Sequence, residues 1–228
     1  PEIGVGLFPD VGFTSVIKTL PDGLGLYMML TATQLSAKDT IFCNLTDASI
    51  KSEDINYLLS EITENIWLDE FQENIDLIGY LVKQNFYADK VKDLPDSKIE
   101  KELDEIQALT NEQELEKVCS NILSNHNDDD WYVRGRNSLK KGSPSSAHLI
   151  WHQCLNSAKL DLKEVFKFEL NLAIQVTRIG DFKEGIRALI IDKDNNPKWR
   201  YDSIESVPID WIKKHTDPAW QQNPLEDL

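Results

Sequence analysis

The sequence predicts a mainly α-helical fold with a few short strands. Helices are indicated by apolar residues that recur at helical spacing, as in the stripe formed by Ile55, Leu58, Leu59, Ile62 and Ile66. They are also indicated by capping pairs, in which a Ser or Asp is followed three residues later by an acidic residue, at Ser36, Ser97 and Asp161. Strand signals are confined to the opening segment and to residues 48–50 and 188–191.

In the first part of the chain, residues 1–12 predict a short strand and a turn, because three glycines allow close backbone approach there. Short helices are expected over residues 13–20 and 24–32, separated by a Pro-Asp-Gly turn, and a third over residues 36–45. The next helix begins at Ser52 and carries the apolar stripe. This stripe predicts a side that faces the core rather than a functional surface.

Further along, residues 90–97 predict a surface loop, and two consecutive helices are expected over residues 97–109 and 111–123. The pair Ser143-Pro144 is the favoured combination for the cap and first position of a helix. A long helix is expected from Asp161 to Ile179, where Gly180 ends it.

Asp181 and Glu184 repeat the capping pattern, and capping explains these two acidic residues without any chemistry. In the C-terminal stretch, Trp211 and Trp220 lie among prolines and charges. Aromatic residues in such a tail are expected to dock it onto the body of the protein rather than to bind a ligand.

The composition limits the classes of function. The 228 residues, 41% of them hydrophobic, are enough for a globular domain with a core. The formal net charge of −15 argues against binding to nucleic acid or to an anionic membrane. No apolar run is long enough to predict a transmembrane helix. The concentrated basic stretch of Arg134, Arg136, Lys140 and Lys141 is interpreted as a solvated face.

Metal sites and disulfides are not expected. Cys43, Cys119 and Cys154 are odd in number and far apart, as in proteins of a reducing compartment. His148 and His152 share a helical face, but no acidic HExxH pattern accompanies them. The segment 192–203 resembles the start of a calcium loop and lacks the required Gly and the final Glu.

Glu2 and Asp10 are the residues that point to chemistry. Both lie in the opening run PEIGVGLFPDVG, among apolar residues, glycines and prolines. Because it is costly to desolvate a carboxylate, acidic residues are rarely placed in such surroundings for stability. The pair is therefore predicted to do acid/base or nucleophilic work.

The opening run closely resembles the signature PExxIGLFPDVGG of the 3-hydroxyisobutyryl-CoA hydrolases, a branch of the crotonase (enoyl-CoA hydratase/isomerase) superfamily. Two later blocks are similar to further motifs of that family. They are Gly142-Ser143-Pro144-Ser145-Ser146 and the segment 180–199, which reads GDFKEGIRALIIDKDNNPKW. Phe13 departs from the pattern, which has a second Gly there, and residues 51–141 match no motif.

The resemblance implies that Glu2 and Asp10 are the catalytic and substrate-binding carboxylates, with no metal and no cofactor, since CoA is part of the substrate. It implies the C-terminal portion of a crotonase-like α/β fold: residues 1–50 end the core and carry the active-site loop, residues 51–142 form a helical region, and residues 143–228 form a second helical region and tail. The preceding half of the polypeptide, with the oxyanion donors, is expected to be missing, so this piece alone should be inactive or nearly so.

The function implied is hydrolysis of 3-hydroxyisobutyryl-CoA or a close 3-hydroxyacyl-CoA, a step of valine catabolism. Hydratase or isomerase activity is an alternative, although relatives with those activities commonly carry Gly at the position of Asp10. A helical interaction module without catalysis is the other alternative. The expected partners are the acyl-CoA and the N-terminal half, with self-association through exposed apolar surface. The expected compartment is the cytoplasm, or the mitochondrial matrix in a eukaryote.

Overall fold

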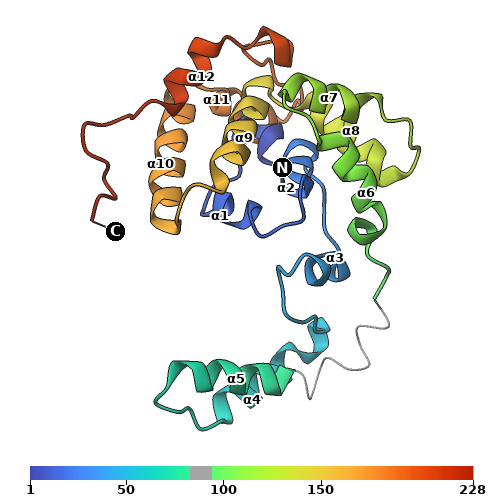
Figure 1. Ribbon diagram of the computed structural model, residues 1–228, viewed down its shortest axis with the longest axis vertical. Coiled ribbons are helices and arrows are strands. Elements are labelled where there is room, and N and C mark those ends of the chain that lie inside the picture. The colour runs from blue at the N-terminus through green and yellow to red at the C-terminus, as the bar shows by residue number, and fades with distance from the viewer. Residues whose placement is uncertain (83–93, 228) are drawn as a thin grey trace. The chain divides into compact units, whose positions relative to one another are not determined.

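The computed structural model describes residues 1–82 and 94–227, which form two compact units. The first unit joins Pro1–Gln34 to Leu103–Leu228, and the second unit is Leu35–Glu102. Helices account for the regular structure of both units, and no strand occurs in the two described ranges (Figure 1). The prediction of a mainly helical fold is confirmed, and the predicted strands are wrong.

The first unit is built around α9 (Pro144–Ser157), which is buried along most of its length. Ser143 caps this helix, its side chain accepting from the Ser146 backbone amide at 3.1 Å, and Pro144 follows at the first position, as predicted. The helices that pack on α9 include α1 (Phe13–Ile17), α2 (Leu24–Thr31), α7 (Leu115–Ser124) and α12 (Ile209–Thr216).

Other helices of the first unit continue from this centre. In chain order they are α8 (Asp130–Lys141), α10 (Leu162–Ile179), α11 (Phe182–Ile186), the π-helical turn η5 (Arg187–Ile191) and the 3₁₀ turn η6 (Ile204–Ser206). Asp161 and Glu164 form the predicted capping box at the start of α10. The helix expected over residues 111–123 begins later than predicted, because α7 starts at Leu115, after Glu114.

The tail docks through Trp211 as predicted, whereas the docking role of Trp220 stays a prediction. Trp211 is buried and its ring stacks on the ring of His215 at a centroid distance of 3.6 Å. The side chain of Asn171 in α10 accepts from the Ala219 backbone amide at 2.6 Å and donates to the Asp217 carbonyl at 3.0 Å. These bonds hold the segment after α12 against α10.

The second unit contains α3 (Ala37–Phe42), the 3₁₀ turn η2 (Ser52–Asp54), α4 (Ile55–Glu64) and α5 (Phe71–Val82), and α6 (Lys98–Thr110) begins in it. The predicted capping box at Ser36 is present. Its Asp39 is buried and also accepts from the Ser97 hydroxyl and the Ile99 amide. Burial raises the pKa of Asp39, but the hydrogen bonds outweigh it and hold the pKa below its usual value.

The three predicted strands have specific replacements. Residues 1–12 contain the 3₁₀ turn η1 (Glu2–Val5), residues 48–50 have no regular structure, and residues 188–191 belong to η5. A strand needs a neighbour for its backbone groups. No described segment offers one, and local bonds such as Leu7 N–H to the Glu2 carbonyl, at 2.9 Å, replace the ladder.

The apolar stripe that begins in α4 does not face the core, so that prediction is wrong. Ile55, Leu59 and Ile66 are exposed, and α4 has no buried residue. Its partners are α5 and the adjoining turn η2, and two helices alone bury only part of their apolar faces. Of the predicted loop 90–97, residues 90–93 lie outside the described residues.

Candidate active site

Glu2 lies on the short turn η1 at the start of the chain. Gly6 ends this turn in the left-handed conformation, with φ of 74°, and its amide donates to the Glu2 carbonyl. The Glu2 side chain is 32% exposed. Glu2 is therefore only partly exposed in this unit, and the neighbouring Ile3 is buried.

The turn η1 is held by very close backbone contacts with α9 and α11. The Ser143 amide donates to the Ile3 carbonyl at 2.9 Å. A Cβ atom added at Gly185 would lie 2.0 Å from the Val5 carbonyl oxygen, and one added at Gly142 would lie 2.7 Å from the Ile3 side chain. Only glycine fits at these two places. The three sequence blocks singled out above therefore meet in space, around the turn that carries Glu2.

Asp181 connects the same segments through its side chain. It is buried, and its carboxylate accepts from the Ser143 hydroxyl at 2.7 Å and from the Arg200 amide at 3.2 Å. Asp181 makes no side-chain capping bond to α11, so the capping role predicted for it is wrong. The buried carboxylate instead finds donors in two distant segments, which fixes the start of α9 beside the start of α11.

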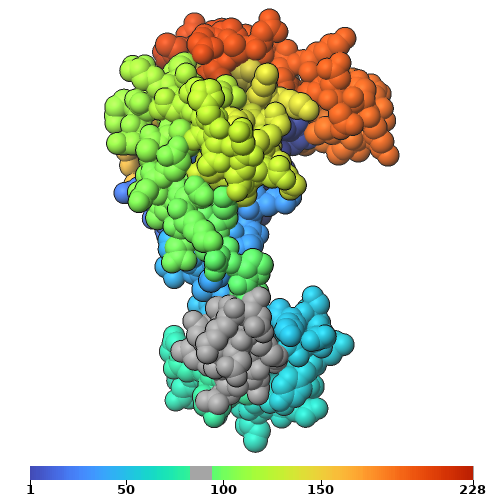
Figure 2. Space-filling model, turned by 90° about the vertical axis from the view of Figure 1, so that its right-hand side faces the viewer, coloured from blue at the N-terminus to red at the C-terminus, as the bar shows by residue number. Residues whose placement is uncertain are grey.

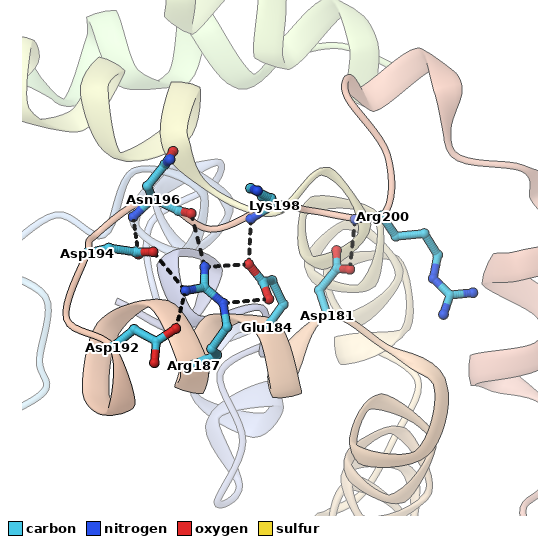
Figure 3. Close-up of polar contacts among 8 residues, drawn as sticks. All are labelled: Asp181, Glu184, Arg187, Asp192, Asp194, Asn196, Lys198 and Arg200. Atoms are coloured by element: carbon cyan, nitrogen blue, oxygen red, sulfur yellow. Dashed lines mark hydrogen bonds and ion pairs between the residues drawn. The ribbon is translucent and has the colours of Figure 1, made fainter.

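Arg187 organises the loop that follows η5 (Figure 3). Its guanidinium binds Glu184 through both carboxylate oxygens, at 2.8 and 3.0 Å, and binds Asp192 and Asp194 at 2.7 Å each. The hydrogen bonds from Arg187 and from the Lys198 amide lower the pKa of Glu184 to about 2. Glu184 is thus a partner of Arg187 and not the predicted cap, and the segment 192–198 folds back onto α11 through this network.

Asp10 lies in a loop that two buried side chains fasten. Gln153 of α9 donates through Nε2 to the Pro9 carbonyl at 2.6 Å and contacts the Thr14 hydroxyl at 3.0 Å. Glu169 of α10 accepts from the Gly12 amide at 2.6 Å and from the Thr14 amide at 2.9 Å. The loop is therefore tied down immediately before and shortly after Asp10.

The loop also contains a strained residue. Val11 has φ of 60° and is 84% exposed. A β-branched residue rarely adopts this left-handed conformation, which costs about 1–3 kcal/mol and persists only where the surroundings impose it. The bonds from Gln153 and Glu169 are such surroundings, and Val11 follows directly after Asp10.

One cavity brings Glu2 and Asp10 together. It has a volume of about 290 Å³, and the two carboxylates share its lining with apolar side chains from α1 and α2. These include Phe13, Met28 and Met29. Two acidic groups at the edge of a largely apolar hollow are suited to proton transfer or nucleophilic attack on a bound group. Phe13, which departs from the family signature, occupies part of this wall.

The basic stretch of α8 does not act as one surface. Arg134 and Lys141 line a larger cavity of about 630 Å³, together with Asp129 and Asp130. Lys140 lines a different hollow, and Arg136 donates to the Asn127 carbonyl. On the face shown in Figure 2, α8 appears in yellow-green beside the green α7, on which it packs. The mixed charges of the larger cavity agree with the interpretation as a solvated face.

The residues considered for metal binding have other roles or lie apart. The His148 ring bonds to the Ile204 carbonyl at 2.9 Å, and the His152 ring lies beside that of Phe168. Burial lowers the pKa of His152. Within residues 1–82 and 94–227, no group of three His, Cys, Asp or Glu side chains could hold a metal ion.

Sequence reasoning missed Glu169 and Gln153, although one signal was available for Glu169. In α10, Val165, Leu172 and Val176 are buried at helical spacing, and Glu169 occupies the position of that stripe where another apolar residue belongs. A carboxylate in an apolar stripe needs donors from outside its helix. Gln153 offered no comparable signal, because a glutamine on a helix says nothing of the loop it will contact.

Comparison with known families identifies the class of protein to which the chain belongs. The model of the enoyl-CoA hydratase/isomerase family matches residues 1–216. The chain belongs to this family.

Individual relatives carry names from one branch of it. The chain is 29% identical over 213 residues to the mitochondrial 3-hydroxyisobutyryl-CoA hydrolase of Xenopus laevis, covering 93% of this chain and 53% of that protein. It is 27% identical to the human protein of the same name, covering 94% of this chain and 54% of that protein. The resemblance drawn from the motifs is confirmed, and the chain spans about half the length of these curated relatives.

Two solved structures share the fold of this chain over part of their own length. The chain matches an enoyl-CoA hydratase from Rhodobacter sphaeroides with a TM-score of 0.76 and 24% identity, covering 96% of this chain and 58% of that one. It matches a carnitinyl-CoA dehydratase from Mycobacterium thermoresistibile with a TM-score of 0.80 and 20% identity, covering all of this chain and 61% of that one. No helix in the described parts of the chain is long and apolar enough to cross a membrane.

Proposed function

We propose that this chain carries the two carboxylates of a CoA-thioester hydrolase that acts on 3-hydroxyisobutyryl-CoA, or on a close 3-hydroxyacyl-CoA, in valine catabolism. The observation that carries the proposal is the cavity of about 290 Å³ that Glu2 and Asp10 line together. Asp10 favours hydrolysis over hydration, because relatives that hydrate or isomerise commonly carry Gly at its position. The names of the relatives support the same branch.

Glu2 is the main catalytic group in this proposal. Its carboxylate either attacks the thioester carbonyl and expels the CoA thiolate, or removes a proton from the water that attacks. Attack by Glu2 forms an anhydride that water then hydrolyses. Single-turnover hydrolysis in oxygen-18 water separates the two routes, since label in the Glu2 carboxylate requires an anhydride at that residue.

Asp10 binds the 3-hydroxyl group of the acyl chain or assists proton transfer to the leaving thiolate. The loop bonds from Gln153 and Glu169 support this role, because they hold the backbone on both sides of Asp10. A carboxylate that accepts a hydrogen bond from a substrate hydroxyl gives strong selection against the substrate that lacks the hydroxyl.

The remaining parts of the site belong to the proposal as well. The donors that stabilise the thioester oxyanion come from the N-terminal half of the same polypeptide, and the loss of even one such donor costs about 100- to 1,000-fold in rate. The chain alone is therefore inactive or nearly so. We further propose the mitochondrial matrix as its compartment if the source is a eukaryote, a polypeptide that self-associates, and no binding to nucleic acid or membrane.

The test compares two thioesters in the complete polypeptide encoded by the gene. The wild type should hydrolyse 3-hydroxyisobutyryl-CoA well and isobutyryl-CoA, which lacks the hydroxyl, at least about 100-fold less efficiently. In Asp10→Asn this preference should shrink, whereas Asp22→Asn, which changes an exposed carboxylate outside the cavity, should keep it. Equal hydrolysis of both thioesters by the wild type would refute binding of the 3-hydroxyl group by Asp10.

A further inference from the structure

Glu169 is a buried carboxylate whose two oxygens both bind backbone amides of the Asp10 loop. Its side chain is 3% exposed and lies in the buried stripe of α10. One oxygen accepts from the Gly12 amide at 2.6 Å and the other from the Thr14 amide at 2.9 Å. In the described part of the chain, Glu169 forms no ion pair with a basic side chain, so these amides are its compensation for burial.

The surrounding contacts fix the loop in one conformation. The Phe166 ring, one turn earlier on the same face of α10, would touch a Cβ atom added at Gly12 at 3.4 Å. Gln153 fixes the Pro9 carbonyl, and because a carbonyl only accepts, the amide nitrogen of Gln153 must face it. The backbone is therefore held at Pro9, Gly12 and Thr14, and Asp10 lies between the first two.

We propose that Glu169 is a positioning residue, which sets the place of the Asp10 carboxylate through the backbone and touches no substrate. The proposal rests on the proposed function, and it goes further by assigning a role to a residue outside the cavity. Without both amide bonds, the strained conformation at Val11 loses its restraint, and the Asp10 side chain is free to leave the cavity.

A purely structural role for Glu169 is the competing explanation. Such a role lowers the amount of folded protein, and it affects variants with and without Asp10 equally. A positioning role acts only through Asp10. A double-mutant cycle with Asp10→Asn distinguishes these two explanations.

The cycle is measured on the complete polypeptide with 3-hydroxyisobutyryl-CoA. Glu169→Gln replaces one acceptor oxygen by a donor of nearly the same shape, and we expect kcat to fall at least about 10-fold with KM changed less than about twofold. In the Asp10→Asn background the same substitution should change kcat less than about twofold. An equal loss of kcat in both backgrounds would overturn the proposal.

Glu164→Gln is the matched control, because Glu164 is on the same helix and its carboxylate, among the described residues, binds only the cap of α10. It should keep the wild-type kcat. If Glu169→Gln does not fold, Glu169→Asp, which keeps the charge and shortens the side chain by one methylene, takes its place. The result expected for Glu169→Asp and the result that would overturn the proposal are those given above for Glu169→Gln.

Amide hydrogen exchange gives a readout that needs no turnover. Exchange at Gly12 and Thr14 should become at least about 10-fold faster in Glu169→Gln and stay unchanged in Glu164→Gln. Unchanged exchange at both amides in Glu169→Gln overturns the positioning role. A wild-type protein that releases no thiol, while exchange responds as expected, contradicts the proposed function and leaves Glu169 as the residue that holds the loop.

Discussion

Alanine in place of Gly185 should displace the turn that carries Glu2. The new Cβ atom would lie 2.0 Å from the Val5 carbonyl oxygen, whereas ordinary contacts begin at 3.4 Å. The backbones of α11 and η1 must therefore separate by about 1.4 Å, which is 3.4 minus 2.0. Both partners in this clash are backbone, so no side-chain rotation relieves it.

The expected effect on stability follows from two opposing contributions. Alanine favours a helix over glycine by about 1 kcal/mol, and overpacking of this kind costs about 1–3 kcal/mol. We expect a net loss of up to about 2 kcal/mol, which lowers Tm by at most about 8 °C, because the shift per kcal/mol is smaller in the longer complete polypeptide. Activity should fall further, because a displacement of about 1 Å at a catalytic group costs about 100-fold in rate.

Gly4→Ala provides the matched control. Gly4 lies in η1 itself, and a Cβ atom added there meets no described residue within 4 Å. Thermal unfolding and thiol release are measured for both variants of the complete polypeptide. The packing argument predicts a loss of Tm and activity in Gly185→Ala only. Wild-type Tm and activity in Gly185→Ala would refute it.

Three further predictions concern other parts of the chain. Arg187→Leu should speed amide exchange at Asn196 and Lys198 by releasing the loop from α11, with little change in Tm because the network is exposed to solvent; protected amides in the variant would contradict the role of Arg187. Burial lowers the pKa of His215 below 6.5. The contribution of His215 to the free energy of unfolding should therefore be fully present above pH 6.5 and be lost at lower pH, where the unfolded chain binds the proton more readily. His215→Gln should reduce the dependence of the free energy of unfolding on pH, and an unchanged dependence would contradict the role given to His215. Burial raises the thiol pKa to about 11 or 12 in all three cysteines, so a thiol reagent at pH 8 should label the native chain slowly and the unfolded chain three times; rapid native labelling would be unexpected.

The sequence predicts those features of the fold that depend on local chemistry. The capping pairs at Ser36 and Asp161 and the Ser143-Pro144 start are present because a side chain within three residues satisfies the first amides. The strand at residues 188–191 and the buried stripe of α4 depended on neighbours that the local sequence does not specify. Residues 188–191 instead form a π-helical turn, and the apolar face of α4 is exposed; tertiary contacts, rather than the local sequence, determine both results.

The sequence likewise predicts part of the candidate site and not the rest. Motif resemblance identified Glu2 and Asp10, and the structure places both on one cavity, while their chemical roles stay a prediction. Asp181 and Glu184 were interpreted as caps, but their partners are Ser143, Arg187 and backbone amides far along the chain. A carboxylate followed by a helix looks the same in the sequence whether it caps that helix or binds a distant segment.

Release of CoA thiol from 3-hydroxyisobutyryl-CoA by the complete polypeptide tests the account most directly, with crotonyl-CoA hydration and Asp10→Gly measured alongside. The account predicts thiol release by the wild type, loss of that release in Asp10→Gly, and little hydration of crotonyl-CoA. Hydration without thiol release would contradict the hydrolase assignment and indicate a hydratase. Neither activity in a folded wild type would contradict catalysis altogether and indicate a helical interaction module.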